Sequence, residues 1–371
     1  MAQKHVVHII SQVYKSLAFE WIAMGLKNDF KLTFILLNSS SSALEEFLIH
    51  HQFEVRRIRY RGKQDFISAF LKTFFFLLFK RPLVVHAHLF DAQLIGLTSA
   101  WLAGIRKRIY TRHYSNYHHI YYSHSVWLDA WSNLVAKYIV SISQATDKTL
   151  LQLEHVPPSK IVKIPHGFEL NAFADVSPRR VERVREKWKI QLKHPVIGVI
   201  ARHIEWKGIQ YIVPAFQRFL QEYPTASLVL ANASGPYQSA IAELLKAIPA
   251  DCVNVITFEE DVAALYAVFD MYVHTPVDSL CEAFGQTYVE ALAAGVPSVF
   301  TLSGIADEFV VHERNALVVE FKDSEGIFNA LMRLWKEAEL RKRLAENGKR
   351  DVFFRFGVES MLVSLKKLYD E

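Results

Sequence analysis

The residues best suited to chemistry lie between Cys281 and Pro297, in the run Cys-Glu-Ala-Phe-Gly-Gln-Thr-Tyr-Val-Glu followed by Ala-Leu-Ala-Ala-Gly-Val-Pro. Seven residues separate its two glutamates, Glu282 and Glu290. Carboxylates only accept hydrogen bonds, so they suit the hydroxyl groups of a sugar or a ribose. Two plainer interpretations stay open: Glu282 as a helix-entry carboxylate that favours the helix dipole, and Glu290 as a solvated surface residue.

A strand, a loop and a helix must position these glutamates. We expect a strand to end at Pro276, a loop to carry Glu282, and a helix to start near Gly285. The first amides of that helix, around Phe284, Gly285 and Gln286, then point out of the carboxyl edge of the sheet. Free N–H groups at a helix start form a ready site for an anion such as phosphate.

Two cations, Arg202 and Lys207, follow the first apolar run of the second half, in the segment Ala-Arg-His-Ile-Glu-Trp-Lys-Gly. Arginine offers a bidentate fork to phosphate oxygens, and lysine offers a point charge. Together they could hold a diphosphate and stabilise it as it leaves. The alternative is a pair of cations on an exposed loop.

The usual cofactor and metal motifs are absent. The 14 glycines include no G-x-G pair, no P-loop motif occurs, and no Asp-x-Asp pair could hold a divalent metal. His86 and His88 share one face of a strand, but no third ligand is evident. Cys252 and Cys281 cannot form a disulfide framework. We therefore expect neither a cofactor nor a bound metal.

Short apolar runs alternate with longer amphipathic ones, which is typical of strands and crossover helices in parallel α/β sheets. The stretch 171–194 loses this periodicity, so we expect a domain boundary there. The expected strands lie near 5–11, 31–38, 54–60, 83–89, 107–113, 138–143, 161–167, 196–201, 226–232, 253–258, 271–276, 297–302 and 315–320, and the helices of the first half near 17–28, 42–50, 64–79, 91–103 and 144–154.

These segments resemble the retaining glycosyltransferases of the GT-B fold, family-four type (glycosyl transferases group 1). Glu282 and Glu290 match that family's motif of two glutamates separated by seven residues, and Arg202 with Lys207 matches its phosphate-binding pair. The stretch 140–171, which contains Pro-His-Gly-Phe, is similar to the family's signature at the end of the first domain.

The resemblance implies an α/β protein with two doubly wound Rossmann-like domains that face an interdomain cleft. Residues 1–172 would form an N-terminal acceptor-binding domain, and a C-terminal helix at 355–371 would pack back onto it. Residues 173–354 would form the domain that binds the nucleotide sugar.

The same resemblance implies a role for each site residue. Glu282 would bind hydroxyls of the donor sugar, Glu290 would bind the ribose, and amides around Phe284 and Gly285 would contact sugar or phosphate. His113 ends an expected strand and matches a first-domain histidine that lies against the donor sugar in this family. Its plainer interpretation is a polar residue that caps a strand end.

Three positions depart from the family pattern. The segment 11–16 lacks the glycine pair that usually follows the first strand, which leaves acceptor handling open. Ala201 replaces a common glycine before Arg202, and Glu259 replaces one after Phe258, where the family contacts the base. The identity of the base is correspondingly open.

Charge is shared unevenly between the halves. Residues 1–175 hold 20 Lys and Arg against 12 Asp and Glu, whereas residues 176–371 hold 23 against 26. The first half therefore suits an anionic partner, and the alternative is a basic surface that only keeps the protein soluble. The aromatic, basic helix at 65–80 could lie in a membrane interface or pack on the sheet as a crossover helix. The aromatic segment 114–127 could be an acceptor platform or an ordinary surface loop.

We expect an enzyme that moves a hexose from a UDP- or GDP-linked sugar to a hydroxyl of a glycan or lipid-linked acceptor, with retention and without metal. Polysaccharide or lipopolysaccharide biosynthesis is the expected setting, in the cytoplasm and peripherally at the inner face of the cell membrane. Only Met1 to Lys4 precede the first expected strand, so we expect no secretory signal, and we expect no nucleic-acid partner. The alternatives are a sugar-nucleotide epimerase of the same fold and a non-catalytic sugar-binding subunit.

Overall fold

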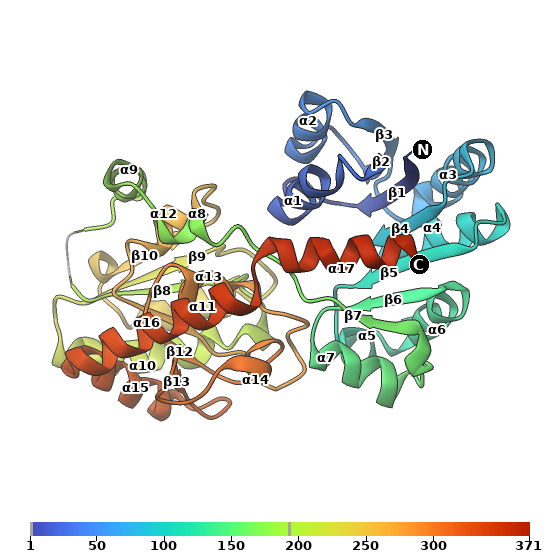
Figure 1. Cartoon of the computed structure of the whole chain (residues 1–371). Coiled ribbons are helices and arrows are strands. Elements are labelled where there is room, and N and C mark those ends of the chain that lie inside the picture. The colour runs from blue at the N-terminus through green and yellow to red at the C-terminus, as the bar shows by residue number, and fades with distance from the viewer. Residues whose placement is uncertain (1–2, 192–193) are drawn as a thin grey trace. The chain divides into compact units, whose positions relative to one another are not determined.

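The computed structural model describes residues 3–191 and 194–371, which fold as two α/β units. Unit 1 consists of Met1–Phe168 with Val358–Glu371, and unit 2 consists of Glu169–Gly357. The chain thus leaves unit 1 once and returns to it with its last helix (Figure 1). The sequence places these boundaries a few residues away, at 172/173 and 354/355.

Unit 1 is built on a seven-stranded sheet with the order β3-β2-β1-β4-β5-β6-β7, in which each strand is parallel to its neighbours. All carboxyl ends therefore meet at one edge, where α/β sheets bind ligands. The strands are β1 (Lys4–Ser11), β2 (Phe30–Asn38), β3 (Glu54–Arg59), β4 (Val84–His88), β5 (Lys107–Arg112), β6 (Tyr138–Ser141) and β7 (Ile161–Lys163).

Helices cover both faces of this sheet. Alternate residues of β1 point to opposite faces, so Val6 and Ile10 pack among side chains of α1, α2 and α17, whereas Val7 and Ile9 pack among those of α3 and α4. The helices are α1 (Leu17–Leu26), α2 (Ala43–His50), α3 (Phe66–Lys80), α4 (Phe90–Leu102), α5 (Tyr117–Tyr121), α6 (Val126–Val135), α7 (Gln144–Lys148, continued by a π-helix over Thr149–Leu153) and α17 (Val358–Asp370).

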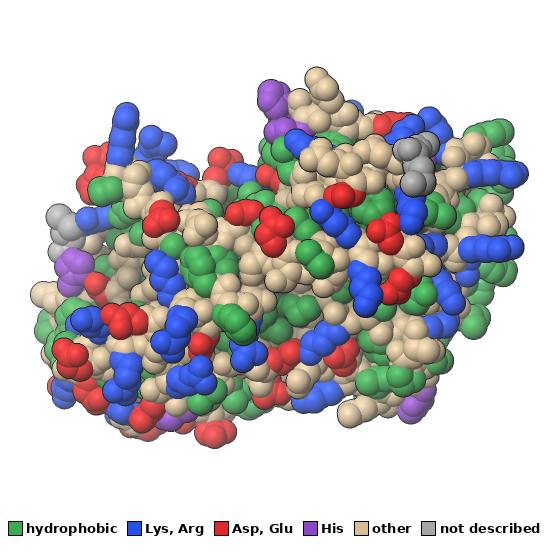
Figure 2. All heavy atoms as spheres, viewed as in Figure 1, with side chains coloured by type: hydrophobic (Ala, Val, Ile, Leu, Met, Phe, Trp, Pro, Cys, Tyr) green, Lys and Arg blue, Asp and Glu red, His purple; other side chains and the backbone are tan. Residues whose placement is uncertain are grey.

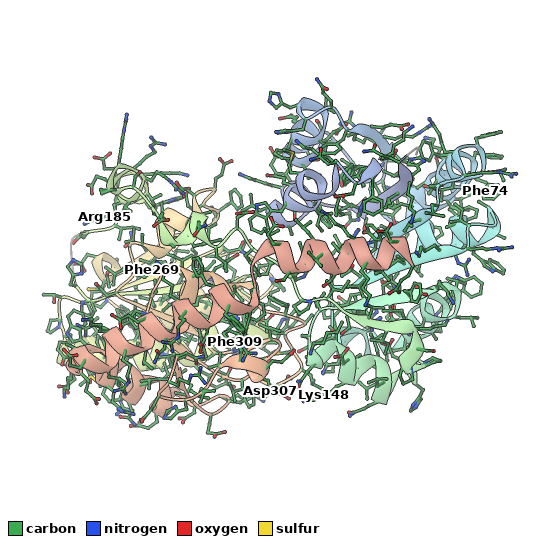
Figure 3. The ribbon with its side chains drawn as sticks, in the orientation of Figure 1. Phe74, Lys148, Arg185, Phe269, Asp307 and Phe309 are labelled. Carbon is green, nitrogen blue, oxygen red and sulfur yellow. The ribbon has the colours of Figure 1, made fainter. Side chains whose placement is uncertain are left out.

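Unit 2 is built on a six-stranded parallel sheet with the order β10-β9-β8-β11-β12-β13. Phe269, labelled in Figure 3, packs on the central strand β8 at Gly198, where an added Cβ would come within 2.1 Å of the ring. The strands are β8 (Val196–Ile200), β9 (Ser227–Ala231), β10 (Val253–Ile256), β11 (Met271–His274), β12 (Ser298–Phe300) and β13 (Leu317–Val318).

The helices of unit 2 include one that lies in the stretch 171–194, where we expect the domain boundary. Helix α9 buries only Val184, and ion pairs from Arg180 to Asp261 and from Lys187 to Glu259 hold it to the segment after β10. The helices are α8 (Asn171–Ala174), α9 (Pro178–Trp188), α10 (Ile209–Glu222), α11 (Gln238–Leu245), α12 (Val262–Tyr266), α13 (Gln286–Ala293), α14 (Ala306–Phe309), α15 (Ser324–Lys336) and α16 (Ala338–Arg355).

Each expected strand range contains a strand. The interpretation of 114–127 as a loop is wrong, because this range contains α5 and the start of α6. The range 171–194, where we expect the domain boundary, contains α8 and α9 of unit 2, and the first boundary between the units lies at 168/169.

Candidate functional site

The expected donor residues of unit 2 gather where β8 and β11, which are neighbours in the sheet, reach the carboxyl edge. The loop after β8 carries Lys207, and the loop after β11 carries Glu282. The Lys207 ammonium donates to Oε1 of Glu282 at 2.5 Å. Gly208 allows this approach, because its φ is +75° and an added Cβ would meet the carbonyl oxygen of Thr275 at 1.9 Å.

Glu282 is a buried carboxylate held by two donors. Its Oε1 accepts from Lys207 and, at 3.2 Å, from Nε2 of His274, the last residue of β11. Burial alone raises the pKa of Glu282, but the charge of Lys207 and the His274 hydrogen bond outweigh it and lower that pKa to about 2. Glu282 is therefore ionised at neutral pH, and among the described residues no hydrogen bond reaches its Oε2.

The start of α13 offers unpaired amides beside this carboxylate. Gly285 precedes the helix with φ +82°, and Ile305 donates its N–H to the Phe284 carbonyl at 2.8 Å. Within the described chain no residue accepts a hydrogen bond from the N–H of Gly285, Gln286 or Thr287. These amides meet the physical requirement for an anion site.

Glu290 lies within α13, and its environment differs from that of Glu282. Its Oε2 accepts from the hydroxyl of Tyr266, the last residue of α12, at 3.0 Å. Burial raises the pKa of Glu290 to about 7, although the Tyr266 bond acts in the opposite direction. Glu290 is half-buried and hydrogen-bonded, which differs from a fully solvated surface carboxylate.

The second expected cation, Arg202, is exposed at the same edge, directly after Ala201. In the described part of the chain its guanidinium has no hydrogen bond and no ion pair. The structure thus brings Lys207 and Glu282 into contact and leaves Arg202 available to an anion.

Sequence reasoning missed His274 and Tyr266, which hold the two glutamates. His274 is 1% exposed, and burial lowers its pKa, so the neutral ring donates from Nε2 to Glu282. The available signal was its place directly before Thr275 and Pro276, at the expected strand end. Tyr266 gave no comparable signal, because nothing in the sequence pairs it with Glu290.

Glu259, the third position that departs from the family pattern, is anchored rather than free. Its carboxylate accepts from Lys187 at 2.8 Å, from the Trp188 indole at 2.5 Å and from the Asp261 amide at 2.8 Å. This carboxylate therefore fastens α9 to the segment after β10.

His113 lies in unit 1, directly after β5. Its Nε2 faces Nδ1 of His88 at 3.4 Å, and its ring stacks on His166 with centroids 5.5 Å apart. Burial lowers the pKa of His113 to about 3, so the ring is neutral at physiological pH.

A buried ion network lies beside His113. Arg112 pairs with Asp129 at 3.2 Å and with Glu154, and Asp129 also accepts from Tyr114 at 2.5 Å and from His118 at 2.7 Å. Tyr114 and His118 are thus fixed in the interior. The exposed rings of this segment are those of Tyr121, Tyr122, His124 and Trp127.

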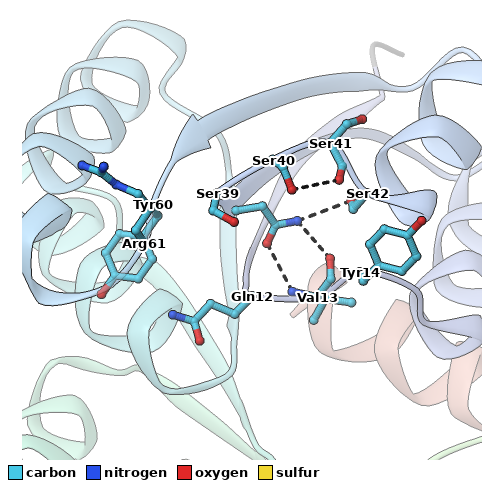
Figure 4. Close-up of a pocket in the computed structure, with 10 residues that line it drawn as sticks. Gln12, Val13, Tyr14, Ser39, Ser40, Ser41, Ser42, Tyr60 and Arg61 are labelled. Atoms are coloured by element: carbon cyan, nitrogen blue, oxygen red, sulfur yellow. Dashed lines mark hydrogen bonds between the residues drawn. The ribbon is translucent and has the colours of Figure 1, made fainter. Parts of the chain in front are cut away.

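Unit 1 has a polar pocket of about 530 Å³ at the carboxyl ends of β1 to β3 (Figure 4). The Asn38 side chain donates to the Val13 carbonyl at 2.9 Å and to the Ser42 hydroxyl at 3.4 Å, and it accepts from the Val13 amide at 3.2 Å. The first loop therefore keeps a defined shape without its usual glycines. The pocket is lined by Gln12, Val13, Tyr14, Asn38, Ser39, Ser40, Ser41, Ser42, Tyr60 and Arg61.

Helix α3 has two different faces. One face, which includes Ala69 and Leu77, is buried and packs on α4. The other carries four large apolar residues at successive i, i+4 positions, here called the α3 stripe. Figure 2 shows apolar and cationic side chains interspersed along this part of unit 1. The stripe consists of Ile67, Leu71, Phe75 and Phe79, which are 73, 45, 49 and 81% exposed.

Two family models match the chain. The model "Glycosyl transferases group 1" matches residues 180–351, and "Glycosyltransferase Family 4" matches residues 13–172, so together they cover most of both units. The chain belongs to the family-four-type glycosyltransferases. Its fold is the two-domain GT-B fold.

Individual relatives of this glycosyltransferase are distant. The alpha-monoglucosyldiacylglycerol synthase of Acholeplasma laidlawii is 26% identical over 56% of this chain and 52% of its own length. The N-acetyl-alpha-D-glucosaminyl L-malate synthase of Bacillus anthracis is 25% identical over 52% of this chain and 49% of its own length. The chain therefore spans about half the length of the curated relatives it matches.

Solved structures match over the whole chain. The crystal structure of Anabaena HepE in complex with UDP-glucose has a TM-score of 0.84 and 20% identity, covering 99% of this chain and 100% of HepE. A glycosyltransferase from Rickettsia africae has a TM-score of 0.80 and 18% identity, covering 100% of this chain and 98% of its own. At such identities the likeness supports the fold. Across the described ranges, no helix has the length and apolarity needed to cross a membrane.

Proposed function

We propose that this glycosyltransferase moves a hexose from a nucleoside diphosphate sugar to an acceptor hydroxyl, with retention at the anomeric carbon. The bond from that carbon to the diphosphate breaks, a bond to the acceptor oxygen forms, and the proton of the acceptor hydroxyl passes to the departing diphosphate. The observation that carries the proposal is the contact of Lys207 with Glu282 beside the unpaired amides that open α13.

The cations act on the leaving group. One N–H of Lys207 is committed to Glu282, which leaves two for phosphate oxygens, and Arg202 adds a bidentate donor. These charges, with the amides of α13, stabilise the negative charge that develops on the departing diphosphate. Because they supply fixed positive charge, we propose that transfer needs no metal ion and no cofactor.

The two glutamates divide the donor between them in this proposal. Glu282 is ionised and presents Oε2, so it accepts from hydroxyls of the transferred sugar. Glu290 lies within α13, and it accepts from hydroxyls of the ribose. His113 of unit 1 supplies a further hydrogen bond to the sugar. The base stays open between uracil and guanine: HepE was crystallised with UDP-glucose, and a relative from Mycobacterium tuberculosis is a GDP-mannose-dependent mannosyltransferase.

The acceptor is proposed to be a glycan or a lipid-linked sugar that enters through unit 1. The pocket at 39–42 and Tyr14 offers consecutive hydroxyls and a 67% exposed aromatic ring, a combination that suits a sugar. The α3 stripe, flanked by Lys72 and Lys80, suits the surface of an anionic bilayer. Peripheral attachment at the inner membrane face, in polysaccharide or lipopolysaccharide assembly, follows as part of the same proposal.

A variant of Lys207 tests the assignment. The purified protein is incubated with UDP- and GDP-sugars, with and without lipid-linked acceptors, and free nucleoside diphosphate is measured. Lys207→Ala should lower transfer by about 10²- to 10³-fold, because a preorganised donor to the leaving group is lost. Lys246→Ala is the matched control, since Lys246 is an exposed lysine paired with Glu243 on the surface.

Two results would overturn the proposal. Turnover of Lys207→Ala within about threefold of the parent would remove the cation from the reaction. Conversion of the sugar nucleotide to an isomer without release of diphosphate would indicate an epimerase instead.

A further inference from the structure

Unit 1 contains a cluster of histidines that the proposed reaction does not use directly. His8 on β1 pairs in register with His86 on β4, and His88 follows two residues later on the same face. These three rings are at most 2% exposed. The sequence offers no third partner for His86 and His88, and the structure supplies it as His8 from the neighbouring strand.

Hydrogen bonds join His8, His88 and His113, in that order, into a chain of three rings. Nδ1 of His8 lies 3.1 Å from Nε2 of His88, with the ring planes 14° apart, and Nδ1 of His88 lies 3.4 Å from Nε2 of His113. The ring centroids of His8 and His88 are 5.4 Å apart, and those of His88 and His113 are 5.7 Å apart. These are the largest centroid separations that nitrogen distances of 3.1 and 3.4 Å allow. Each bond therefore points straight from ring to ring.

This geometry favours hydrogen bonding over a metal centre. Nitrogens of His8, His86 and His88 lie within 4.8 Å of one another, close enough to consider an ion. Ligating nitrogens would aim at a common point, however, whereas those of His8 and His88 aim at each other. Both nitrogens of His86 also have partners, the hydroxyls of Tyr369 at 2.6 Å and Thr111 at 2.8 Å.

This chain of hydrogen bonds couples the positions of the protons on the three histidine rings. Burial lowers the pKa of His8 to about 3 and that of His88 well below its usual value, so each neutral ring has one N–H. If His8 donates from Nδ1, Nε2 of His88 accepts, so the one N–H of His88 is on its Nδ1. Nε2 of His113 then accepts from that N–H, and the proton of His113 must be on Nδ1. If the direction is reversed, His113 donates from Nε2, and His8 carries its proton on Nε2.

The inner end of the chain decides the direction. Nε2 of His8 is buried and has no hydrogen-bond partner among the residues that the structure describes. In the reversed direction this atom would be a buried N–H without an acceptor, a group that folded proteins rarely leave unpaired. If His8 instead donates from Nδ1, its Nε2 carries only a lone pair.

We infer that His8 and His88 are positioning residues that hold His113 in the tautomer protonated on Nδ1. Since Nε2 of His113 then accepts from His88, Nδ1–H is the group that His113 can donate to an oxygen of the donor sugar. That last step rests on the proposed function, but the tautomer does not. A ring whose second nitrogen is fixed by a neighbour presents one defined hydrogen-bonding group to its ligand.

Nitrogen-15 NMR of the histidine-labelled full chain reads the tautomer directly. The His113 signals are identified by their loss in His113→Gln, and in the parent protein they should report a protonated Nδ1. His8→Phe removes the inner donor, so His113 should become a mixture of both tautomers. His8→Asn places an amide N–H near the lost Nδ1 and should restore the single tautomer.

His86→Gln is the matched control, because His86 is equally buried on the same face but lies outside the chain. It should leave the His113 tautomer unchanged. A His113 protonated on Nε2 in the parent, or one unaffected by His8→Phe, would overturn the inference. Retention of added Zn²⁺ with shifts of the His8, His86 and His88 signals would also overturn it, in favour of a metal site.

Kinetics separate this inference from the proposed function. His8→Phe should slow sugar transfer by roughly tenfold, as loss of an outer hydrogen-bond partner commonly does, while affinity for the free nucleoside diphosphate stays unchanged. If the NMR result holds and the parent shows no transfer, the proposed function fails and the histidine chain stands.

Discussion

Glu290 provides a sharp test of the site, because its environment changes its ionisation. Burial raises its pKa from the usual 4.5 to about 7, a differential interaction of about 3 kcal/mol. A carboxyl whose pKa is raised on folding favours the folded state below pH 4.5, and its contribution is lost as the pH rises through about 7. Glu290→Gln keeps the shape and removes the ionisation. Relative to the parent, its free energy of unfolding should therefore rise by about 3 kcal/mol between pH 4.5 and pH 8.

Calorimetry across that pH range measures the effect on the transition of unit 2. In a domain of this size 3 kcal/mol corresponds to roughly 6 to 12 °C in Tm. Glu282→Gln is the control, because the pKa of Glu282 is lowered to about 2. Its stabilising contribution is present above pH 4.5 and is lost only as the pH falls towards 2, so its deficit should stay constant from pH 5 to 8. A flat difference for Glu290→Gln would show that Glu290 ionises like an exposed carboxyl and would refute the reasoning.

Three further predictions concern the metal, the core and the membrane. Transfer activity should survive EDTA, and its loss followed by recovery with Mg²⁺ or Mn²⁺ would contradict a reaction driven by fixed cations. Asp129→Ala should lower the unfolding free energy by roughly 3–5 kcal/mol in denaturant titrations, because it breaks a buried pair with Arg112, and a cost under 1 kcal/mol would show that the pair is dispensable. Phe79→Ser should reduce flotation with anionic liposomes at low salt, whereas Phe354→Ser, at an 88% exposed site in unit 2, should not; equal recovery of both would remove the α3 stripe from membrane binding.

The strands could be predicted from sequence because a parallel sheet buries both faces of each strand, which leaves short continuous apolar runs. Helix α6 could not be recognised as easily. Its buried residues include Asp129, which pairs with Arg112, Asn133, which donates to Glu154, and Ser132, so its apolar periodicity is hidden.

Helix α9 escaped prediction for the opposite reason. It buries a single apolar residue, Val184, and is held by ion pairs to residues more than seventy positions away. After Pro178, every residue of α9 other than Val181, Val184 and Trp188 is charged. Those residues are indistinguishable from a solvated linker until their partners are placed.

The candidate site shows the same contrast between a local sequence pattern and distant partners. Glu282, Glu290, Arg202 and Lys207 could be selected by residue type and spacing, since strand ends and a helix start position them locally. Their protonation could not be predicted, because it depends on partners supplied by other elements. His274 helps to keep one glutamate ionised, whereas burial near Tyr266 brings the other to a pKa near neutrality.

The loop after β1 shows that a missing glycine motif does not imply a missing loop shape. Gln12 adopts φ +55°, a conformation that glycine enters easily and other residues at a cost. Two contacts hold it there. The backbone N–H of Gln12 donates to the Leu37 carbonyl at 3.0 Å, and the Asn38 side chain binds the backbone N–H and C=O of Val13. The long-range hydrogen bonds thus replace conformational freedom as the means of fixing the turn. Because this turn forms one wall of the polar pocket, the sequence departure that left acceptor handling open is also where the proposed acceptor site acquires its own side chains.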